Sequence, residues 1–465
     1  MAASMVAFRF QEKSRRRNAL RNFWILTAAV LGCCLPALAQ NLVPLPELNS
    51  RRLLNDLHVT VASTKNTGDN MTIGLVVRYG SAFDPAEKGG MANLVSQMFM
   101  RATNDLTSKG IQDELAFLGA TLEVRCDWDG FRFLLNGPSS KYERALFLLY
   151  QVVAEAQFTE ADFKAAKESI LQKIQRPPDP RQRIHRQLEN VLFSGTTYGR
   201  PIEGDQRSLS AITLGDVRFF YKKFFSPGEA SLLIVGNVTE SLVLQRVSRI
   251  WGLWVRDEDV PPTFLVPRKP AGRQIFLEDD PDSPAAQFIV GNLFPRREDP
   301  IYAYALLAAQ IFQERLTKLL PTSLLTVGYE GRRMSGPFFV QGQAAADQAV
   351  EQIQKIRDAA DELKNTLIAK EELAAAQKKV IESFYRQFGT TAGICDVLVD
   401  SELYHLGSNY AVLFPDQIRR CDVDALKETA NNWIFPSGEV ILIRGPAATL
   451  KLLLEPLGSP HPLIP

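Results

Sequence analysis

The sequence predicts an α+β protein of two homologous domains, each an antiparallel-rich sheet packed with helices. The chain has 465 residues, of which 46% are hydrophobic, and this is enough for two buried cores. A Pro-rich segment at 259–272 has the composition of a linker. Strand-like and helix-like runs follow one another in the same order on both sides of it. We therefore expect domains at 40–258 and 273–465.

The first 39 residues have the order of a secretory signal peptide. Basic residues at 15–17 precede an apolar run at 23–35, and Ala37-Leu38-Ala39 has the small residues of a cleavage site. We expect loss of residues 1–39 and secretion across the inner membrane into the periplasm. Two alternatives stay open. Cys33 lies in a lipobox-like segment, so its lipidation would give a membrane-anchored lipoprotein, or the apolar run is retained as an uncleaved anchor.

Charge excludes nucleic acid as a partner. The full chain has a formal net charge of +1, and the first 39 residues contain six basic residues and one acidic residue. The remainder therefore has a net charge of −4, and it shows no basic patch of the kind that binds phosphate backbones. We also expect no contact with a membrane unless Cys33 is lipidated.

In the first half, alternating and apolar runs predict strands, and longer periodic runs predict helices. The expected hairpin turns at Asp129-Gly130, a turn signal between two alternating runs. The expected strands are 59–62, 72–77, 123–127, 131–135 and 231–238. The expected helices are 91–99, 141–156 and 160–174, and another helix runs through His185 and Leu192 after the Pro-rich break at 177–180; the segment 213–225 then leads to the last strand.

The second half repeats this order. Two long helices rich in Ala, Lys and Glu correspond to the two long helices of the first half, and an apolar strand closes each half. The expected strands are 274–277, 286–291, 338–344 and 439–445, and the expected helices are 300–316, 347–363, 370–388 and 423–433.

The expected helix at 91–99 has an apolar face and a polar face. Asn93, Ser96 and Gln97 share the polar face at i, i+3 and i+4. In an inverted zincin motif, His-x-x-Glu-His, those positions hold two imidazoles that bind Zn²⁺ and a Glu that acts as general base. All three side chains are neutral here. The simplest interpretation is a solvated helix face, and it agrees with the absence of zinc chemistry.

The surroundings of this helix resemble the insulinase-type (M16) metallopeptidase family. In that family a strand ending in Gly-Ser leads into the zinc helix, as Gly80-Ser81 does here. The resemblance implies a LuxS/MPP-like metallohydrolase fold. It also implies that Asn93, Ser96 and Gln97 replace the two His ligands and the Glu. The family's third ligand is a Glu on a later helix, where this chain has Lys173, with a shift of one or two residues left open.

No metal site is predicted elsewhere, and no cofactor. The four histidines are His58, His185, His405 and His461, and no two are spaced like the ligands of a single helix. Cys126, Cys395 and Cys421 are equally dispersed. We therefore expect a homologue of the metallopeptidases that is not itself an enzyme.

The second half also departs from active family members. There the resemblance implies an Arg and a Tyr that contact substrate, and Pro321 and Thr326 stand near those positions. A short gap would instead bring Tyr329 to the Tyr position. Arg332-Arg333 lies beyond it, and we expect either a site for a carboxylate or a solvated loop.

Peptide binding remains possible at a sheet edge. In the family, substrates add a strand beside the zinc helix, and Glu123, Val124 and Arg125 occupy the corresponding place. The alternative is an ordinary edge strand that its alternating charges protect from aggregation.

Three functions follow from the resemblance. The first is a catalytically inactive M16-like subunit that pairs, as a heterodimer, with a zinc-bearing M16 peptidase and helps to form its peptide-binding chamber. The second is a peptide-binding or scaffold protein that acts without a peptidase partner. The third is a peptidase that uses unorthodox residues, although no Gly-x-Ser-x-Gly elbow or zincin motif supports it.

Overall fold

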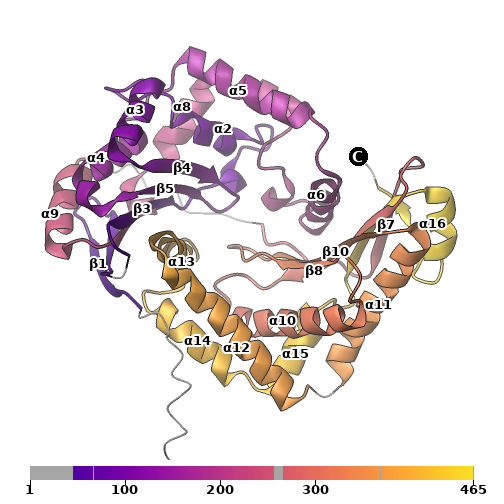
Figure 1. Ribbon diagram of the computed structural model, residues 1–465. Helices are drawn as coiled ribbons and strands as arrows, with labels where there is room; N and C mark the ends of the chain where they lie inside the picture. The colour runs from indigo at the N-terminus through magenta and orange to yellow at the C-terminus, as the bar shows by residue number, and fades with distance from the viewer. Residues whose placement is uncertain (1–44, 66, 256–264, 367, 464–465) are drawn as a thin grey trace, which may run out of the picture. The chain divides into compact units, whose positions relative to one another are not determined.

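A computed structural model describes residues 45–65, 67–255, 265–366 and 368–463 (Figure 1). The predicted signal peptide at 1–39, its cleavage site and Cys33 lie outside the described residues, as does part of the predicted linker. In the described part, no helix combines the length and the apolar character needed to cross a membrane.

The first half of the chain forms a six-stranded sheet. Its strands are β1 (Glu47–Arg52), β2 (His58–Ser63), β3 (Asn70–Val77), β4 (Thr121–Cys126), β5 (Phe131–Pro138) and β6 (Ala230–Gly236). They lie in the order β1-β2-β6-β3-β5-β4, and only β2 and β6 are parallel. Strands β3 and β6 are buried along almost their whole length, as expected when both faces of a sheet are covered.

The second half forms a sheet with the same plan. Its strands are β7 (Gln274–Asp279), β8 (Ala286–Phe294), β9 (Thr326–Tyr329), β10 (Gly336–Ala344), β11 (Val440–Gly445) and β12 (His461–Pro462). The order is β12-β7-β11-β8-β10-β9, with β11 and β12 parallel to β7. The run β7-β11-β8-β10-β9 thus repeats the order and directions of β2-β6-β3-β5-β4. This confirms the predicted α+β fold of two homologous parts.

Several helices of the first half begin at side-chain caps. Thr107, Thr159 and Thr213 each accept a hydrogen bond from a backbone N–H of the first turn, which satisfies donors that have no partner within the helix. These helices are α2 (Met91–Met98), α3 (Ser108–Leu118), α4 (Tyr142–Ala154), α5 (Glu160–Gln175), α6 (Pro180–Leu192), α7 (Gln206–Ala211), α8 (Leu214–Phe224) and α9 (Glu240–Trp251).

The helices of the second half include two long amphipathic ones close to the predicted ranges. They are α10 (Tyr302–Leu319), α11 (Ala346–Asn365), α12 (Lys370–Arg386), α13 (Thr391–Leu403), α14 (Tyr410–Arg420), α15 (Val423–Trp433) and α16 (Ala447–Leu454). Short 3-10 helices are η1 (Ser81–Phe83), η2 (Ser139–Lys141), η3 (Thr197–Gly199), η4 (Pro227–Glu229) and η5 (Gln387–Gly389).

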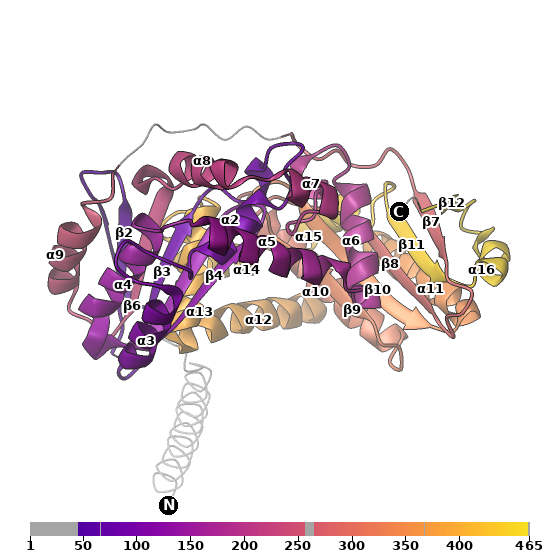
Figure 2. The same cartoon turned by 90° about the horizontal axis from the view of Figure 1, so that it is seen from above.

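One helix of each half packs on the sheet of the other half. Helix α6 lies against β8, β10 and β11, and α13 lies against β3, β5 and β6 (Figure 2). Both contacts are close. A Cβ on Gly291 of β8 would lie 2.5 Å from Leu188 of α6, and a Cβ on Gly74 of β3 would lie 2.5 Å from the Sγ of Cys395 in α13. The sequence pattern does not predict this exchange, and the domain boundaries at 40–258 and 273–465 stay a prediction.

Candidate functional site

Helix α2 forms where the sequence predicts the altered zinc helix, and Asp84 fixes its N-terminus. Asp84 accepts hydrogen bonds from the backbone N–H groups of Gly90 at 2.8 Å and Ala92 at 2.9 Å. Gly90 has a φ of 92°, a left-handed conformation that favours glycine. Burial raises the pKa of Asp84 to about 7, although the N–H groups of Ala92 and Gly90 oppose the shift.

Asn93, Ser96 and Gln97 lie on α2, but the face they form is packed. Ser96 is 7% exposed, and its Oγ donates a hydrogen bond to the Asn93 carbonyl at 2.7 Å. Asn93 and Gln97 are half-buried, and Asn93 Nδ2 has no hydrogen-bond partner among the described residues. The interpretation of this face as solvated is therefore wrong for Ser96. Because none of the three side chains is an imidazole, a thiolate or a carboxylate, they do not fit Zn²⁺.

Lys173 lies on α5, which packs against α2. Its side chain is exposed and lines a cavity whose lining does not include Asn93, Ser96 or Gln97. An ammonium group has donors and no acceptor, so it repels a metal ion. The structure therefore provides no replacement ligand at Lys173 for the zinc that the family resemblance implies.

Strand β4 is the outer strand of the first sheet, and no other strand of the described part of the chain pairs with its outer edge. Glu123 and Arg125 project to its exposed face, and Val124 projects toward the core. The Glu123 carboxylate accepts two hydrogen bonds from the Arg125 guanidinium, from Nη2 at 2.8 Å and from Nε. This hydrogen bond raises the pKa of Arg125. The three residues thus lie at a sheet edge, and their binding of a peptide stays a prediction.

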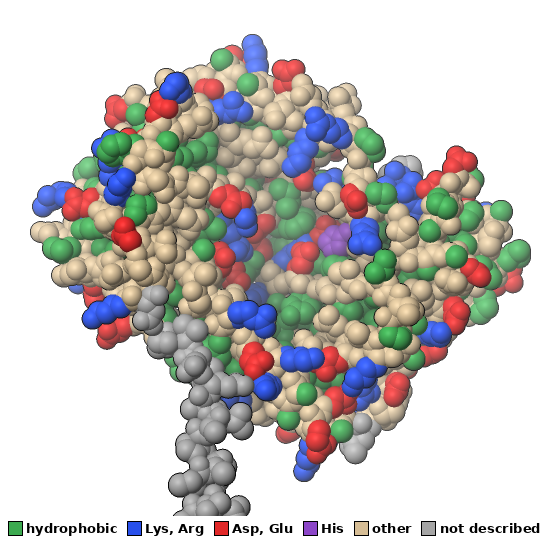
Figure 3. Space-filling view, in the orientation of Figure 1, with side chains coloured by type: hydrophobic (Ala, Val, Ile, Leu, Met, Phe, Trp, Pro, Cys, Tyr) green, Lys and Arg blue, Asp and Glu red, His purple; other side chains and the backbone are tan. Residues whose placement is uncertain are grey.

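A cavity of about 530 Å³ lies between α6 and the segment that follows β9, and we call it the α6 cavity. Its lining includes residues from both halves of the chain: Trp128, Lys173, His185, Glu189, Glu330 and Arg332. Figure 3 shows a hollow in which acidic and basic side chains gather around a histidine. The α6 cavity is thus polar and charged.

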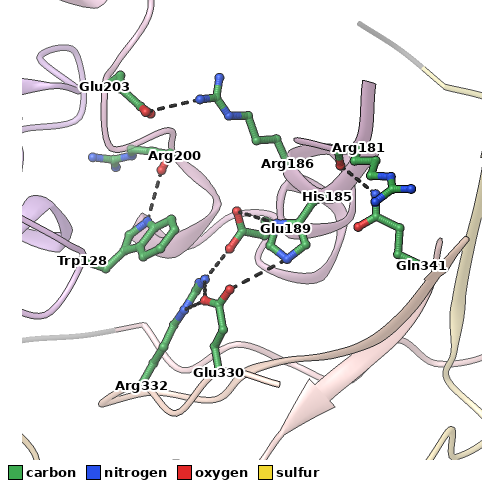
Figure 4. Close-up of polar contacts among 10 residues, drawn as sticks. All are labelled: Trp128, Arg181, His185, Arg186, Glu189, Arg200, Glu203, Glu330, Arg332 and Gln341. Atoms are coloured by element: carbon green, nitrogen blue, oxygen red, sulfur yellow. Dashed lines mark hydrogen bonds and ion pairs between the residues drawn. The ribbon is translucent and has the colours of Figure 1, made fainter. Parts of the chain in front are cut away.

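Arg332 connects the walls of the α6 cavity. Its guanidinium is 4% exposed, contacts the carboxylates of Glu189 and Glu330, and lies 3.8 Å from the ring centroid of Trp128 (Figure 4). Burial alone lowers the pKa of Arg332, but the two carboxylates outweigh burial and the pKa is raised. Arg332 is therefore a buried cross-link between segments, and the expectation of a solvated loop is wrong for it.

A second cavity of about 440 Å³ begins at the end of β4, and we call it the β4 cavity. Arg125 lines it, and it shares Trp128, Glu330 and Arg332 with the α6 cavity. The two cavities therefore share part of their walls, and the β4 cavity begins at the edge of β4. Asp400 of the exchanged helix α13 also lines the β4 cavity and binds Arg132 at 3.2 Å.

The predicted replacements in the second half line neither cavity. Pro321 is exposed after α10, and Thr326 begins β9. Tyr329 ends β9, and its ring stacks on Phe294 with a centroid distance of 5.5 Å. Neither Pro321, Thr326 nor Tyr329 is among the residues that line the α6 or β4 cavity.

Sequence reasoning missed His185, Glu189 and Glu330. His185 and Glu189 are four residues apart, which places them on one face of α6. The i, i+4 spacing in the sequence is the signal that could have identified His185 and Glu189 as a pair of neighbouring side chains. Glu330 comes from the other half of the chain, and only the exchange of α6 brings it to them.

Two family models match consecutive parts of the chain. The model of the insulinase family, peptidase family M16, matches residues 60–206, and the model described as the peptidase M16 inactive domain matches residues 211–380. The second description concerns a domain and does not itself classify the first half of this chain.

Relatives are distant. A protein named as an uncharacterized zinc protease from Rickettsia bellii is 21% identical over 396 residues, which cover 81% of this chain and 93% of that protein. Subunit 1 of the bovine mitochondrial cytochrome b-c1 complex (Bos taurus) is 22% identical, over 52% of this chain and 50% of that protein. Alignments with other curated relatives also span about half of the relatives' own length.

Solved structures share the fold at low sequence identity. A peptidase M16 inactive domain from Pseudomonas fluorescens has a TM-score of 0.78 and 21% identity, over 86% of this chain and 98% of that one. The periplasmic protease PqqL from Escherichia coli has a TM-score of 0.72 and 14% identity, over 89% of this chain and 50% of that one. With the two matched family models and the repeated sheets, these similarities show that the chain belongs to the insulinase-like M16 peptidase family.

Proposed function

We propose that this chain is a catalytically inactive M16-like subunit that pairs with a zinc-bearing M16 peptidase and helps to form its peptide-binding chamber. One observation carries the proposal. The family fold is retained, whereas the positions that the family resemblance assigns to the zinc ligands and the base hold Asn93, Ser96, Gln97 and Lys173, which lack the imidazoles and carboxylates that bind the metal and activate its water. A chain that keeps the peptidase fold without the zinc ligands is better suited to binding a partner or a peptide than to cleaving one.

Peptide binding is proposed for the edge of β4 and the adjoining β4 cavity. An extended peptide can add to the free edge of β4 through backbone hydrogen bonds. Its side chains would then meet the β4 cavity, where Arg125, Arg132 and Asp400 supply charge. The Glu123–Arg125 ion pair lies on the exposed face, so it leaves the backbone edge accessible.

The proposed location is the periplasm, after loss of residues 1–39. The basic start, the apolar run and Ala37-Leu38-Ala39 support export. A solved structure with the same fold is described as a periplasmic protease. N-terminal sequencing of the exported protein distinguishes a start at Gln40 from retention of a lipidated Cys33.

Pairing is tested by co-expression with an M16 chain that has an intact His-x-x-Glu-His helix and is encoded in the same genome. We expect a complex with one copy of each chain in size-exclusion chromatography, and faster peptide cleavage than by the zinc-bearing chain alone. A chain that forms only homodimers and leaves cleavage unchanged would contradict pairing.

Strand addition predicts slower hydrogen exchange at β4. In the complex with a zinc-bearing chain whose catalytic Glu is replaced by Gln, a library of unstructured peptides should protect the backbone amides of 121–126, because they gain hydrogen bonds. Strand β1 at 47–52 is the matched control, since it is the opposite edge of the same sheet. Equal protection of both edges, or of neither, would refute binding at β4.

Restoring the zinc residues is expected to give little peptide hydrolysis. The variant Asn93→His, Ser96→Glu, Gln97→His and Lys173→Glu supplies ligands, but the packed α2 face lacks partners to orient them. A carboxylate at the buried position 96 should also lower the free energy of unfolding by about 1–3 kcal/mol. Zinc content, urea unfolding and peptide hydrolysis are measured beside the parent protein and Lys173→Glu alone. Robust hydrolysis that depends on zinc would identify a recently silenced peptidase instead.

A scaffold without a peptidase partner is the second candidate. The similarity to subunit 1 of the cytochrome b-c1 complex favours it, because that relative is by its name a component of a larger complex. A stable assembly that contains no zinc-bearing M16 chain would support this function over pairing.

A further inference from the structure

His185, Glu189 and Glu330 form a cluster of potential metal ligands in the α6 cavity (Figure 4). One nitrogen of His185 and one oxygen of each carboxylate all lie within 4.8 Å of one another. The positions that the family resemblance assigns to zinc are on α2 and α5, so this cluster uses different residues. It also joins the two halves, because α6 comes from the first half and Glu330 follows β9 in the second.

The distances in the cluster are too long for hydrogen bonds. His185 Nδ1 lies 3.9 Å from Glu189 Oε2, and His185 Nε2 lies 3.8 Å from Glu330 Oε1. Two atoms bound to the same tetrahedral Zn²⁺ at ~2.1 Å would lie about 3.4 Å apart. The two distances involve different ring nitrogens, whereas an ion binds one of them, and a set with one atom from each residue spans up to 4.8 Å. Side-chain rotations must therefore shorten these spacings by up to about 1.4 Å to bring one ring nitrogen and two oxygens around an ion.

Arg332 holds the carboxylates in the orientation that a metal would need. It contacts Glu189 through Oε1 and Glu330 through Oε2, which leaves Glu189 Oε2 and Glu330 Oε1 directed toward His185. Arg332 is itself 4% exposed, and its Nη1 has no hydrogen-bond partner among the described residues. Such outer hydrogen bonds are the usual means of orienting ligand carboxylates.

The ring of His185 is also held in place. It packs edge-on against Phe339 of β10, with a centroid distance of 4.6 Å. The groups in direct contact, two carboxylates and one guanidinium, have a net charge of −1, which favours a cation. Lys173, Arg181 and Arg186 also line the cavity and oppose it. Imidazole with carboxylates suits Zn²⁺ and similar divalent transition metals.

We propose that His185, Glu189 and Glu330 bind one divalent transition metal ion, with Zn²⁺ as the first candidate, at a site that links the two halves of the chain. Its remaining coordination positions would face the α6 cavity. Only three protein ligands are available, and Lys173 and Arg181 line the same cavity. We therefore expect micromolar affinity. This inference does not depend on the proposed pairing with a peptidase.

The test is isothermal titration of the tag-free protein with ZnCl₂ after treatment with EDTA. We expect one ion per chain, at least tenfold weaker binding by His185→Gln and by Glu330→Gln, and a Zn²⁺-dependent rise in melting temperature in the parent only. His461→Gln is the matched control, since this exposed histidine lies on β12 and should bind as the parent does. Near-ultraviolet circular dichroism in EDTA checks the fold of each variant. Glu330 is 41% exposed, so Glu330→Gln should remain folded.

Two further outcomes would overturn the proposal. Absence of a binding isotherm for the parent at 100-fold molar excess of ZnCl₂ is one. The other is unchanged binding by His185→Gln and Glu330→Gln, which would identify adventitious binding elsewhere. The double variant Asn93→Ala, Gln97→Ala separates the two possible locations, because its loss of binding would place the ion on α2 instead.

Discussion

Replacing Glu402 by alanine is expected to lower the free energy of unfolding by about 3 kcal/mol. Glu402 lies on the exchanged helix α13, and its Oε2 accepts hydrogen bonds from Ser231 at 2.7 Å, His58 at 2.9 Å and Arg78 at 3.2 Å. The side chains of Glu402 and Arg78 are 18% and 14% exposed. Alanine would leave the Arg78 guanidinium buried without this carboxylate, which is the costly way to break a buried ion pair.

The loss is measured by urea unfolding at neutral pH, with Glu428→Ala as the control, because Glu428 is exposed on α15. Burial raises the pKa of Glu402, but the hydrogen bond from His58, followed by Ser231 and Arg78, brings it below its ordinary value. The stabilisation is therefore present at neutral pH and is lost as the pH falls through the pKa of the folded state. A loss under 1 kcal/mol, or one equal to that of Glu428→Ala, would contradict this role.

Replacing Asp84 by alanine is expected to lower the free energy of unfolding by about 2 kcal/mol at pH 5, because the buried N–H groups of Gly90 and Ala92 lose their acceptor. The loss should be smaller at pH 8. The pKa of Asp84 is about 7 in the folded protein, whereas the ordinary value of an aspartate, which applies to the unfolded chain, is 3.8. Between these values the folded state holds more protons than the unfolded state, so stability falls as the pH rises.

Unfolding of the parent and Asp84→Ala proteins at pH 5 and pH 8 gives this difference directly. Asp422→Ala is the control for a helix cap at the surface, since Asp422 accepts a hydrogen bond from Ala425 and is exposed. The Asp422→Ala substitution should lower the free energy of unfolding by about 1 kcal/mol. A loss from Asp84→Ala that is greater at pH 8 than at pH 5 would show that the carboxylate is the favoured buried form.

Local sequence patterns predicted most elements of the fold. The hairpin around Asp129-Gly130 forms as β4 and β5, and the long helix expected at 160–174 forms as α5. These predictions succeed because turn chemistry and apolar periodicity act over a few residues. The helix at 391–403 was missed. It is buried on several sides, so its apolar residues do not form a single stripe.

The candidate site was only partly predictable. Asn93, Ser96 and Gln97 are visible in the sequence because they are close in it, and their helix formed as expected. The α6 cavity is not visible there, since Glu330 meets His185 only after α6 crosses to the second sheet. The missing information is tertiary: no local pattern states on which sheet an amphipathic helix will pack.

The crossing of α6 and α13 has a consequence for how this chain could have evolved by duplication. If the protein were cut between its two sheets, each fragment would carry away a helix that covers the other fragment's β strands, and each would expose the strand surface around Gly74 or Gly291 that this helix contacts closely. We therefore expect neither fragment to fold stably alone. A duplication that produces a larger protein of this fold should copy both halves together. The fold of PqqL is consistent with this, since this chain covers 50% of it and 94% of the separately solved first half.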